Sequence, residues 1–238
     1  MMEYRWGNTP LSSAGSIRGF GGRFNVGNDI ELSLIDPFPA LYVADSQATA
    51  YRERYQISDA GAPGGGLSNV ELDLGVSTCT VRLDGHIDRV LDVTDPLALA
   101  PICRIFKKIR MPPEVARIMK RLKMKPDAIK MVNTPRDLQR AIIERNWRTW
   151  PIQFGIPSPS QMLAEIAIAA GYEAIRYRSS KSCTGKCLAI FSGNLATRES
   201  FVALTDAAPD TVNHSRLDIE SADELAGWEH APRSKMRK

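Results

Sequence analysis

The apolar segments of this 238-residue chain are short, and residues such as glycine and proline separate them. No run of about 18 apolar residues is present, so no membrane-spanning helix is expected. The length suffices for one large domain, or for one domain with an insertion. Short apolar or alternating runs predict strands at 40–44, 70–74, 79–83, 90–93, 174–177, 188–191 and 201–204.

A helix is expected directly after the first of these strands. Asp45 or Ser46 can cap it by accepting a hydrogen bond from one of its free backbone amides. Glu53 lies off the expected buried face of this helix, so its carboxylate can point into a cleft. The residues of that expected buried face follow helical spacing: Ala44, Ala48, Tyr51 and Tyr55.

The second half of the chain begins with a helical region that prolines interrupt, residues 97–150. We interpret it as an insertion in a domain that spans 1–205. Ser158 or Ser160 is expected to cap the next helix, which Gly171 ends. Residues 206–238 are expected to form a polar, loosely ordered tail.

Positive charge is concentrated in one region of the chain. Residues 101–150 carry 14 Lys/Arg and 4 Asp/Glu, a net charge of +10, which leaves −6 for the remainder of a chain whose net charge is +4. A block of this size favours an acidic partner, either a protein or a nucleic acid. Its only aromatic residues are Phe106, Trp147 and Trp150, too few for base stacking. No direct nucleic-acid binding is therefore expected.

The cysteines and histidines are scattered. Four cysteines form no CxxC pair and three histidines are isolated, so no metal site is expected. The first residues lack the apolar region of a signal peptide. Reduced thiols and a cytoplasmic location are the simplest expectation.

Five side chains could carry chemistry, and each also has an ordinary structural interpretation. Arg23 follows glycines and offers a two-pronged donor for phosphate, or is a surface residue of a loop. Tyr42 could line a cleft, or be a core tyrosine with a satisfied hydroxyl. Glu53 could act on a ligand, or be solvated on its helix. Ser179 and Ser180 follow a strand, where polar groups often meet ligands, or simply form a turn.

The order of these segments resembles the RES-domain family, bacterial toxins named for an Arg, a Glu and a Ser. Tyr4-Arg5 opens the chain, residues 22–25 read Gly-Arg-Phe-Asn, 41–44 read Leu-Tyr-Val-Ala, and Glu53 follows. Residues 171–180 and 184–191 resemble the family's serine segment and the segment after it, although Arg178 stands in the usual place of proline. The resemblance covers roughly 4–55 and 158–195.

The resemblance implies an α+β fold like that of ADP-ribosyltransferase toxins, with two packed, mainly antiparallel sheets and NAD in the cleft between them. NAD would be a consumed substrate, and no metal would be needed. Glu53 would stabilise the ribose carbon, Arg23 and Arg5 would hold the pyrophosphate or a ribose edge, Tyr42 would stack near the nicotinamide, and Ser179 would contact the ribose or the amide. The family's usual partner is an antitoxin with a helix-turn-helix DNA-binding domain.

Several functions remain open at this point. The first is a toxin that cleaves NAD and transfers ADP-ribose to a protein acceptor. Within the same class, water or phosphate could be the acceptor, so that the enzyme is an NAD glycohydrolase or phosphorylase. A basic nucleic-acid-binding protein and a catalytically inactive interaction domain are the alternatives from other classes. Nicotinamide release separates the NAD-consuming enzymes from the other two.

Overall fold

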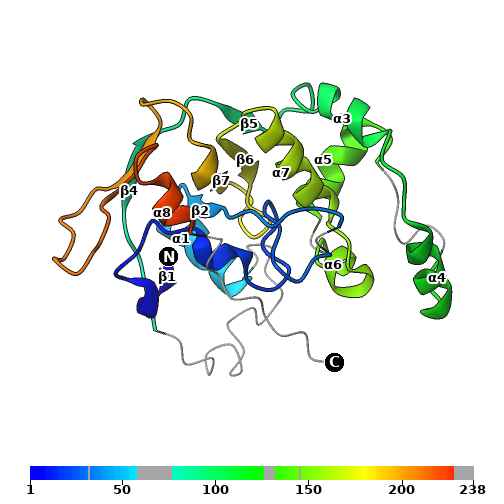
Figure 1. The fold of residues 1–238 in the computed structure, drawn as a ribbon, viewed down its shortest axis with the longest axis horizontal. Coiled ribbons are helices and arrows are strands. Elements are labelled where there is room, and N and C mark those ends of the chain that lie inside the picture. The colour runs from blue at the N-terminus through cyan, green and yellow to red at the C-terminus, as the bar shows by residue number, and fades with distance from the viewer. Residues whose placement is uncertain (32, 58–76, 126–131, 145, 228–238) are drawn as a thin grey trace.

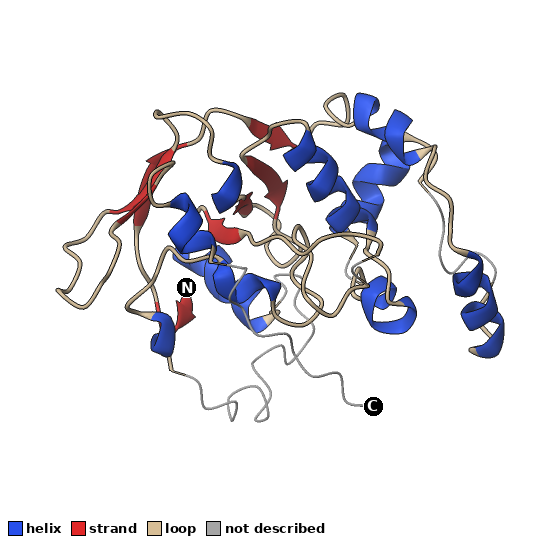
Figure 2. Cartoon of the chain, viewed as in Figure 1, coloured by secondary structure: helices blue, strands red, loops and turns tan. Residues whose placement is uncertain are grey.

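The structure of this protein is a computed structural model (Figure 1) that describes residues 1–31, 33–57, 77–125, 132–144 and 146–227, with only the backbone of Arg5. The expected strand at 70–74 lies outside these residues. The described chain forms an α+β fold with mixed and antiparallel sheets, as the resemblance implied (Figure 2). No helix in the described part of the chain has the length and apolar character needed to span a membrane.

A four-stranded sheet forms the centre of the fold, with strand order β2-β7-β6-β5. Its strands are β2 (Leu41–Ala44), β5 (Val90–Asp92), β6 (Ala174–Arg178) and β7 (Lys186–Ile190). A three-stranded sheet of order β4-β8-β9 packs against it, formed by β4 (Leu83–His86), β8 (Phe201–Leu204) and β9 (Arg216–Leu217). A third pair joins β1 (Met2–Glu3) to β3 (Thr78–Cys79). All these pairings are antiparallel except that of β5 with β6.

Helices occupy the other face of the four-stranded sheet (Figure 1). They are α3 (Ala100–Phe106), α5 (Pro135–Ile143) and α7 (Pro159–Ala169), while α4 (Pro113–Arg121) lies at the periphery and α6 (Thr149–Phe154) precedes α7. The remaining elements are α1 (Gln47–Tyr55), α8 (Ala222–Ala226) and the 3-10 turns Tyr4–Trp6, Ala14–Ile17 and Ser192–Asn194.

Side chains of the central strands point alternately to the two faces of the sheet, and this alternation divides the core into two layers. Ile175 and Ala189 are buried against α3, α5 and α7, whereas their neighbours Ala174 and Ile190 are buried against β8, β9 and α8. Because successive side chains of a strand point to opposite faces, one apolar strand supplies both layers. Tyr42 consequently packs on the helical side of the sheet and Val43 on the side of the second sheet.

The basic region 97–150 is part of the main core. Strands β5 and β6 run parallel, so the chain between them must cross over, and helices α3 to α7 form this connection. Ile102, Phe106, Leu138 and Ile142 from the region are buried in the same cluster as the central strands. The region therefore contributes to the stability of the fold as well as carrying charge.

Residues 206–227 of the expected polar tail are part of the folded domain. β9 pairs with β8, and α8 packs beside it, with Leu217 and Leu225 buried in the second core layer. Many residues of this segment are polar, including Arg216 in β9 and Asp223 and Glu224 in α8, which is why composition alone suggested a loose tail. Residues 228–238 lie outside the described chain.

The expected buried face of α1 was wrong. Ser46 caps the helix as predicted, accepting from the amide of Thr49 at 3.1 Å. Ala48 and Tyr51 are exposed, however, and Thr49 is the buried residue of the helix. Tyr51 instead stacks on Tyr55 outside the core, with ring centroids 4.7 Å apart. The helix turns Thr49 and Glu53 inward, because these residues are four apart and share one face.

Candidate active site

Glu53 and Ser179 meet where the inner face of α1 contacts the loop after β6. The hydroxyl of Ser179 donates to Oε1 of Glu53 at 2.5 Å, and the backbone amide of Ser180 donates to the same oxygen at 3.1 Å. Gly185 allows this approach, since a Cβ there would lie 2.5 Å from Oγ1 of Thr49 on α1. Oε2 of Glu53 receives no hydrogen bond within the described part of the chain, so its capacity to accept one is unused there.

All the hydrogen-bonding capacity of the Ser179 hydroxyl is used. Its proton goes to Glu53, and its oxygen accepts from the amides of Lys181 and Ser182, each at 3.0 Å. The amide of Ser179 donates to the carbonyl of Gly185 at 2.9 Å, which closes the loop. In this structure Ser179 therefore positions Glu53. The contact with ribose expected for Ser179 would require one of these bonds to be exchanged.

Arg23 lies beside this pair and is held by the end of α5. Its Nη1 donates to the carbonyl oxygens of Ile142 and Glu144, both at 2.8 Å, and Nη2 lies 3.4 Å from Oγ of Ser180. Both hydrogens of Nη1 are thereby used and one hydrogen of Nη2 is directed at Ser180, so Nε and the second hydrogen of Nη2 have no acceptor in the described part of the chain. Burial lowers the pKa of Arg23, whereas the neighbouring Tyr177 and Glu53 act to raise this pKa.

Tyr42 fastens the loop that carries Arg23. Its hydroxyl accepts from the amide of Phe24 and donates to Oδ1 of Asn25, each at 2.8 Å. Burial raises the pKa of this phenol well above its ordinary value. The hydroxyl thus matches the alternative of a satisfied core tyrosine, and stacking of the ring on nicotinamide stays a prediction.

Two glycines of this loop are required by its geometry. Gly21 has φ +83°, in the left-handed region that favours glycine. A Cβ at Gly22 would lie 2.5 Å from the hydroxyl oxygen of Tyr42 and 2.6 Å from Oδ1 of Asn25. The glycines before Arg23 therefore serve close packing of the loop on Tyr42, in addition to any role in approaching a ligand.

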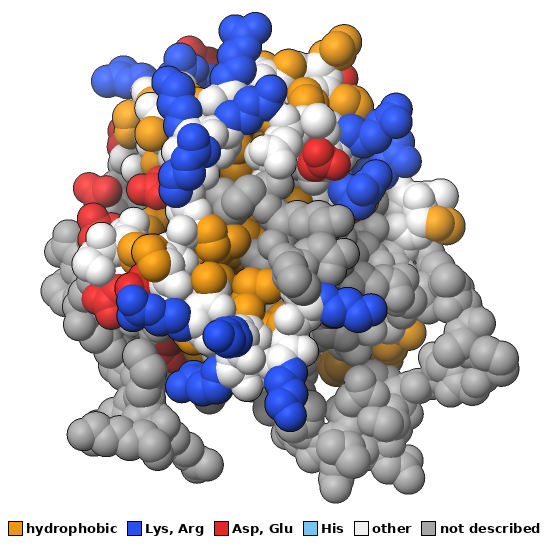
Figure 3. All heavy atoms as spheres, turned by 90° about the vertical axis from the view of Figure 1, so that its right-hand side faces the viewer, with side chains coloured by type: hydrophobic (Ala, Val, Ile, Leu, Met, Phe, Trp, Pro, Cys, Tyr) orange, Lys and Arg blue, Asp and Glu red, His pale blue; other side chains and the backbone are white. Residues whose placement is uncertain are grey.

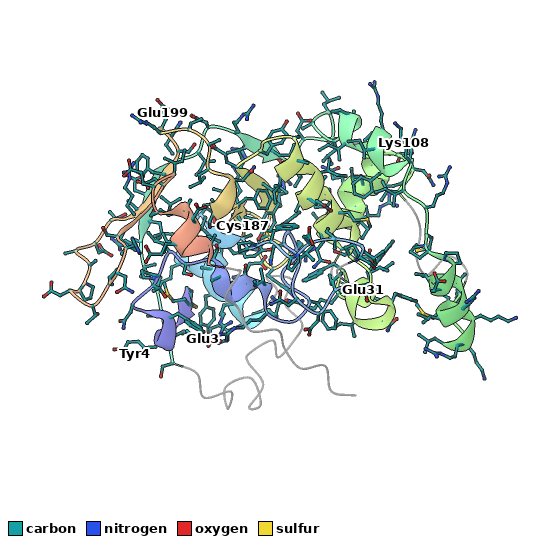
Figure 4. The ribbon with its side chains drawn as sticks, in the orientation of Figure 1. Glu3, Tyr4, Glu31, Lys108, Cys187 and Glu199 are labelled. Atoms are coloured by element: carbon teal, nitrogen blue, oxygen red, sulfur yellow. The ribbon has the colours of Figure 1, made fainter. Side chains whose placement is uncertain are left out.

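The floor of the site is apolar and buried. The ring of Tyr177 packs on Phe24, with centroids 4.7 Å apart, and Cys187 pairs with Tyr177 across β6 and β7. Burial, and next the proximity of Glu53, raises the pKa of Cys187 to about 12, so this thiol is not a nucleophile at neutral pH. Figure 4 shows Cys187 near the middle of the molecule, far from peripheral residues such as Lys108.

The hollow between the two sheets is separate from this cluster. It has a volume of about 370 Å³, and Val43, Leu188 and Val202 contribute to its walls. An ion pair between Arg176 and Asp92 lies at its lining. None of Arg23, Tyr42, Glu53 and Ser179 contributes to the lining, because these residues lie on the helical side of the central sheet. The cleft expected between the sheets thus differs from the place where the four residues meet.

Two other expectations concern Arg5 and metal ions. The backbone of Arg5 lies in the 3-10 turn Tyr4–Trp6, but its side chain is outside the described structure. Among the described residues no group of three or more His, Cys, Asp or Glu side chains could hold a metal ion. No disulfide joins any of the four cysteines, all of which lie in the described part of the chain.

The sequence patterns did not identify several of the groups that hold the arginine loop and the side chain of Arg23 in place. The carbonyl groups of Ile142 and Glu144 belong to the region expected to be a separate insertion. Asn25 and Gln161 supply further hydrogen bonds to the loop. Asn25 could have been found, because it belongs to the motif Gly-Arg-Phe-Asn. The carbonyl groups of Ile142 and Glu144 could not, because backbone carbonyls leave no signal in a sequence.

The model of the RES domain matches residues 104–220. The match includes Ser179, Cys187 and much of the basic region, and it does not extend to Arg23, Tyr42 or Glu53. RES domains are associated with NAD-consuming toxins of toxin–antitoxin systems. No curated protein and no solved structure is significantly similar to this chain. The structure brings the Arg, Glu and Ser motifs together, and residues 104–220 of this chain belong to the RES-domain family.

Proposed function

We propose that this protein is the toxin of a toxin–antitoxin pair, which cleaves NAD at the bond between nicotinamide and ribose and transfers ADP-ribose to a protein acceptor. One observation carries the proposal. A carboxylate, Glu53, is held by Ser179 and Ser180 through one oxygen and keeps its other oxygen for a ligand, beside the guanidinium of Arg23. A carboxylate beside a fixed cation suits a substrate that develops positive charge at one carbon and carries a pyrophosphate.

The chemistry needs no acid for the leaving group. When the bond from ribose C1′ to the pyridinium nitrogen breaks, the electron pair neutralises that nitrogen and nicotinamide departs uncharged. C1′ is left with oxocarbenium character, which a nearby carboxylate stabilises as it does in glycosidases. The acceptor then forms a bond to C1′ and loses a proton. In this proposal Oε2 of Glu53 faces the ribose, because Oε1 is occupied by the serine loop.

The other predicted residues have supporting roles in the proposal. Nε of Arg23, together with Nη2, which also donates to Ser180, would contact the pyrophosphate or a ribose hydroxyl. Ser179 orients Glu53 and would reach the ribose only after exchanging a bond. Tyr42 would offer a ring edge near the nicotinamide while its hydroxyl holds the loop. Arg5 would add a second cation from the first turn of the chain. NAD is consumed, and the proposal requires no metal.

The acceptor defines the second candidate within this class. If water or phosphate attacks C1′, the enzyme is an NAD glycohydrolase or phosphorylase and depletes cellular NAD. The exposed basic surface favours a macromolecular acceptor. Four cysteines without a disulfide suit a reducing compartment, so the cytoplasm is the proposed place of action.

The basic surface of α3 and α4 also supports a protein partner. Figure 3 shows Lys and Arg outnumbering Asp and Glu on the side of the molecule that carries these helices. The exposed apolar residues Ile105 and Leu122 lie among these charges, and the exposed aromatic rings used to stack on bases are lacking in the described α3 and α4. This mixture suits an acidic protein, such as an antitoxin that also carries a DNA-binding helix-turn-helix domain, better than a nucleic acid. The exposed cations concerned are Arg104, Lys107, Lys108, Arg110, Arg117, Lys120, Arg121, Lys123 and Lys125.

Incubation of the purified protein with NAD, followed by mass spectrometry of both protein and small molecules, tests the proposal. Nicotinamide together with a protein adduct of ADP-ribose is the expected result when an acceptor is present. Free ADP-ribose without a protein adduct would show that the enzyme hydrolyses NAD. ADP-ribose 1″-phosphate without an adduct would show that it uses phosphate as the acceptor. Intact NAD after incubation with folded wild-type protein would contradict the proposed function.

A further inference from the structure

The arginine loop, residues 19–27, has no helix or strand of its own, yet its backbone is closely held. Three of its carbonyl oxygens, those of Phe20, Gly22 and Asn25, converge on Nε2 of Gln161 at 2.8, 3.2 and 3.0 Å. Gln161 is completely buried. These contacts join segments that lie 136 to 141 residues apart in the chain.

The orientation of the Gln161 amide is determined by its partners. Its Oε1 accepts from the backbone amide of Ser158 at 2.9 Å, and an amide nitrogen of the main chain can only donate. The three loop carbonyls can only accept, so the NH₂ group must face them. Gln161 therefore has one end in the capping box of α7 and the other on the loop. Helix α7 is itself rigidly placed, since Leu163, Ala164 and Ala167 are buried in the main core.

The residues on both sides of Arg23 are held by this arrangement. Gly22 donates its amide to Oδ1 of Asn25 at 2.8 Å and presents its carbonyl to Gln161. Phe24 donates its amide to Tyr42 at 2.8 Å. The guanidinium of Arg23 is then held by α5. A side chain whose backbone and head group are both fixed loses little entropy when a ligand binds.

We propose that Gln161 is the positioning residue of the active-site arginine. It acts through the arginine loop, because its Nε2 holds loop carbonyls on both sides of Arg23. The inference deepens the proposed function and rests on it, since the consequence for catalysis depends on Arg23 holding NAD. The fixing of the loop itself does not depend on that function.

Gln161→Met tests the proposal because methionine has a similar length and no donor. We expect the KM for NAD to rise about tenfold while kcat changes by less than about threefold, as the loss of ligand positioning predicts. Gln161→Glu keeps the shape and places an oxygen against three carbonyls, so it should raise KM further. Ser158→Ala is the matched control: it removes the cap of the same helix, lowers Tm and leaves the contacts of Nε2 in place.

A double-mutant cycle separates positioning from general packing. In an Arg23→Ala background, Gln161→Met should alter KM by less than about twofold, because the residue it positions is already absent. If the fold-changes in KM caused by the two substitutions simply multiply in the double variant, the proposal is overturned. An equal rise of KM in Ser158→Ala and Gln161→Met, at matched loss of Tm, would do the same.

Hydrogen exchange gives a readout that needs no NAD. In the wild type the amides of Gly22 and Phe24 should be protected, and Gln161→Met should make both exchange faster while Ser158→Ala does not. Unchanged exchange at these two amides in Gln161→Met would overturn the positioning role. If the wild type releases no nicotinamide, the proposed function alone fails, and the exchange result still decides whether Gln161 fixes the loop.

Discussion

Ser179 donates a 2.5 Å hydrogen bond to Glu53 across 126 residues of sequence. This bond joins two of the three residue types for which the family is named, and the third, Arg23, lies 3.4 Å from the neighbouring Ser180. The hydroxyl proton of Ser179 is thereby used by the Glu53 carboxylate, and only one of the two carboxylate oxygens takes part in this contact. The predictions below follow from this division of roles.

Glu53→Gln should nearly abolish nicotinamide release without unfolding the protein. An amide cannot stabilise a developing positive charge as a carboxylate does, and the loss of one such electrostatic contact typically lowers the rate about 10²–10³-fold. The measurement is nicotinamide release under saturating NAD, with circular dichroism as the check on folding. Glu199→Gln, an exposed change far from the site, is the control. Wild-type turnover in folded Glu53→Gln would remove Glu53 from the mechanism.

Arg23→Lys should weaken NAD binding although it preserves the charge. A lysine cannot span the carbonyls of Ile142 and Glu144 while presenting a second donor edge, because its charge sits on a single nitrogen. We expect Kd for NAD to rise about tenfold, the loss of a charge-assisted hydrogen bond. Calorimetry measures it, with exposed Arg198→Lys as control. Unchanged affinity would make Arg23 a structural residue of its loop.

Ser179→Ala should reduce turnover more than Ser180→Ala. The first change removes the bond to Glu53 and frees two amides, whereas alanine at 180 keeps the backbone donor to Glu53 and loses only the 3.4 Å contact with Arg23. A hydrogen bond to a charged group contributes about 1.5–3 kcal/mol, so a loss of about tenfold to a hundredfold is expected for Ser179→Ala. Parallel kcat measurements on the two variants check the order, and the reverse ranking would contradict it.

Acid should destabilise the fold in part through Glu173, a completely buried carboxylate. Burial raises its pKa, but hydrogen bonds from the amide of Ala196, the hydroxyl of Ser200 and the amide of Arg89 outweigh this and lower the pKa overall. A lowered folded-state pKa gives stability that is fully present above the unfolded value, near 4.3, and is lost as pH falls through the folded value.

Glu173→Gln should therefore be less stable at pH 7, because its NH₂ group would face these donors. A cost of about 1–3 kcal/mol is expected from the unsatisfied buried groups. Its stability should also fall less steeply below about pH 4 than that of the wild type. Urea unfolding at pH 7 and at acidic pH measures both. Parallel pH profiles of the two proteins would show that the carboxylate contributes nothing to the acid sensitivity.

Reversal of Lys120, Arg121, Lys123 and Lys125 to Glu should slow association with an acidic partner, most strongly at low salt. NAD hydrolysis should change little, because these residues lie in α4 and just after it, whereas the basic region meets the site through Ile142 and Glu144. Retention of the wild type by immobilised polyglutamate, compared with duplex DNA of equal charge, checks the class of partner. Loss of NAD turnover in the folded variant with unchanged retention would place α4 in the active site.

Several elements could be read from local patterns because their causes are local. Ser46 and Ser158 cap their helices through backbone amides three residues away, and such spacing is visible in sequence. The strands at 41–44, 174–178 and 201–204 coincide with short apolar runs. The buried face of α1 could not be read in this way, because its apolar residues Ala48 and Tyr51 face outward while Thr49 and Glu53 face the serine loop.

By itself the sequence determined the residue types of the candidate site and the elements that carry them: an arginine between glycines, a glutamate on a short helix and a serine after a strand. Only the tertiary structure decided which of them touch and which atoms remain for a ligand. Arg23 reaches Ile142 across 119 residues, and Gln161 reaches Asn25 across 136. Such bonds depend on how the sheet and the crossover helices pack, and many of their acceptors are backbone carbonyls, which every residue possesses and no sequence pattern distinguishes.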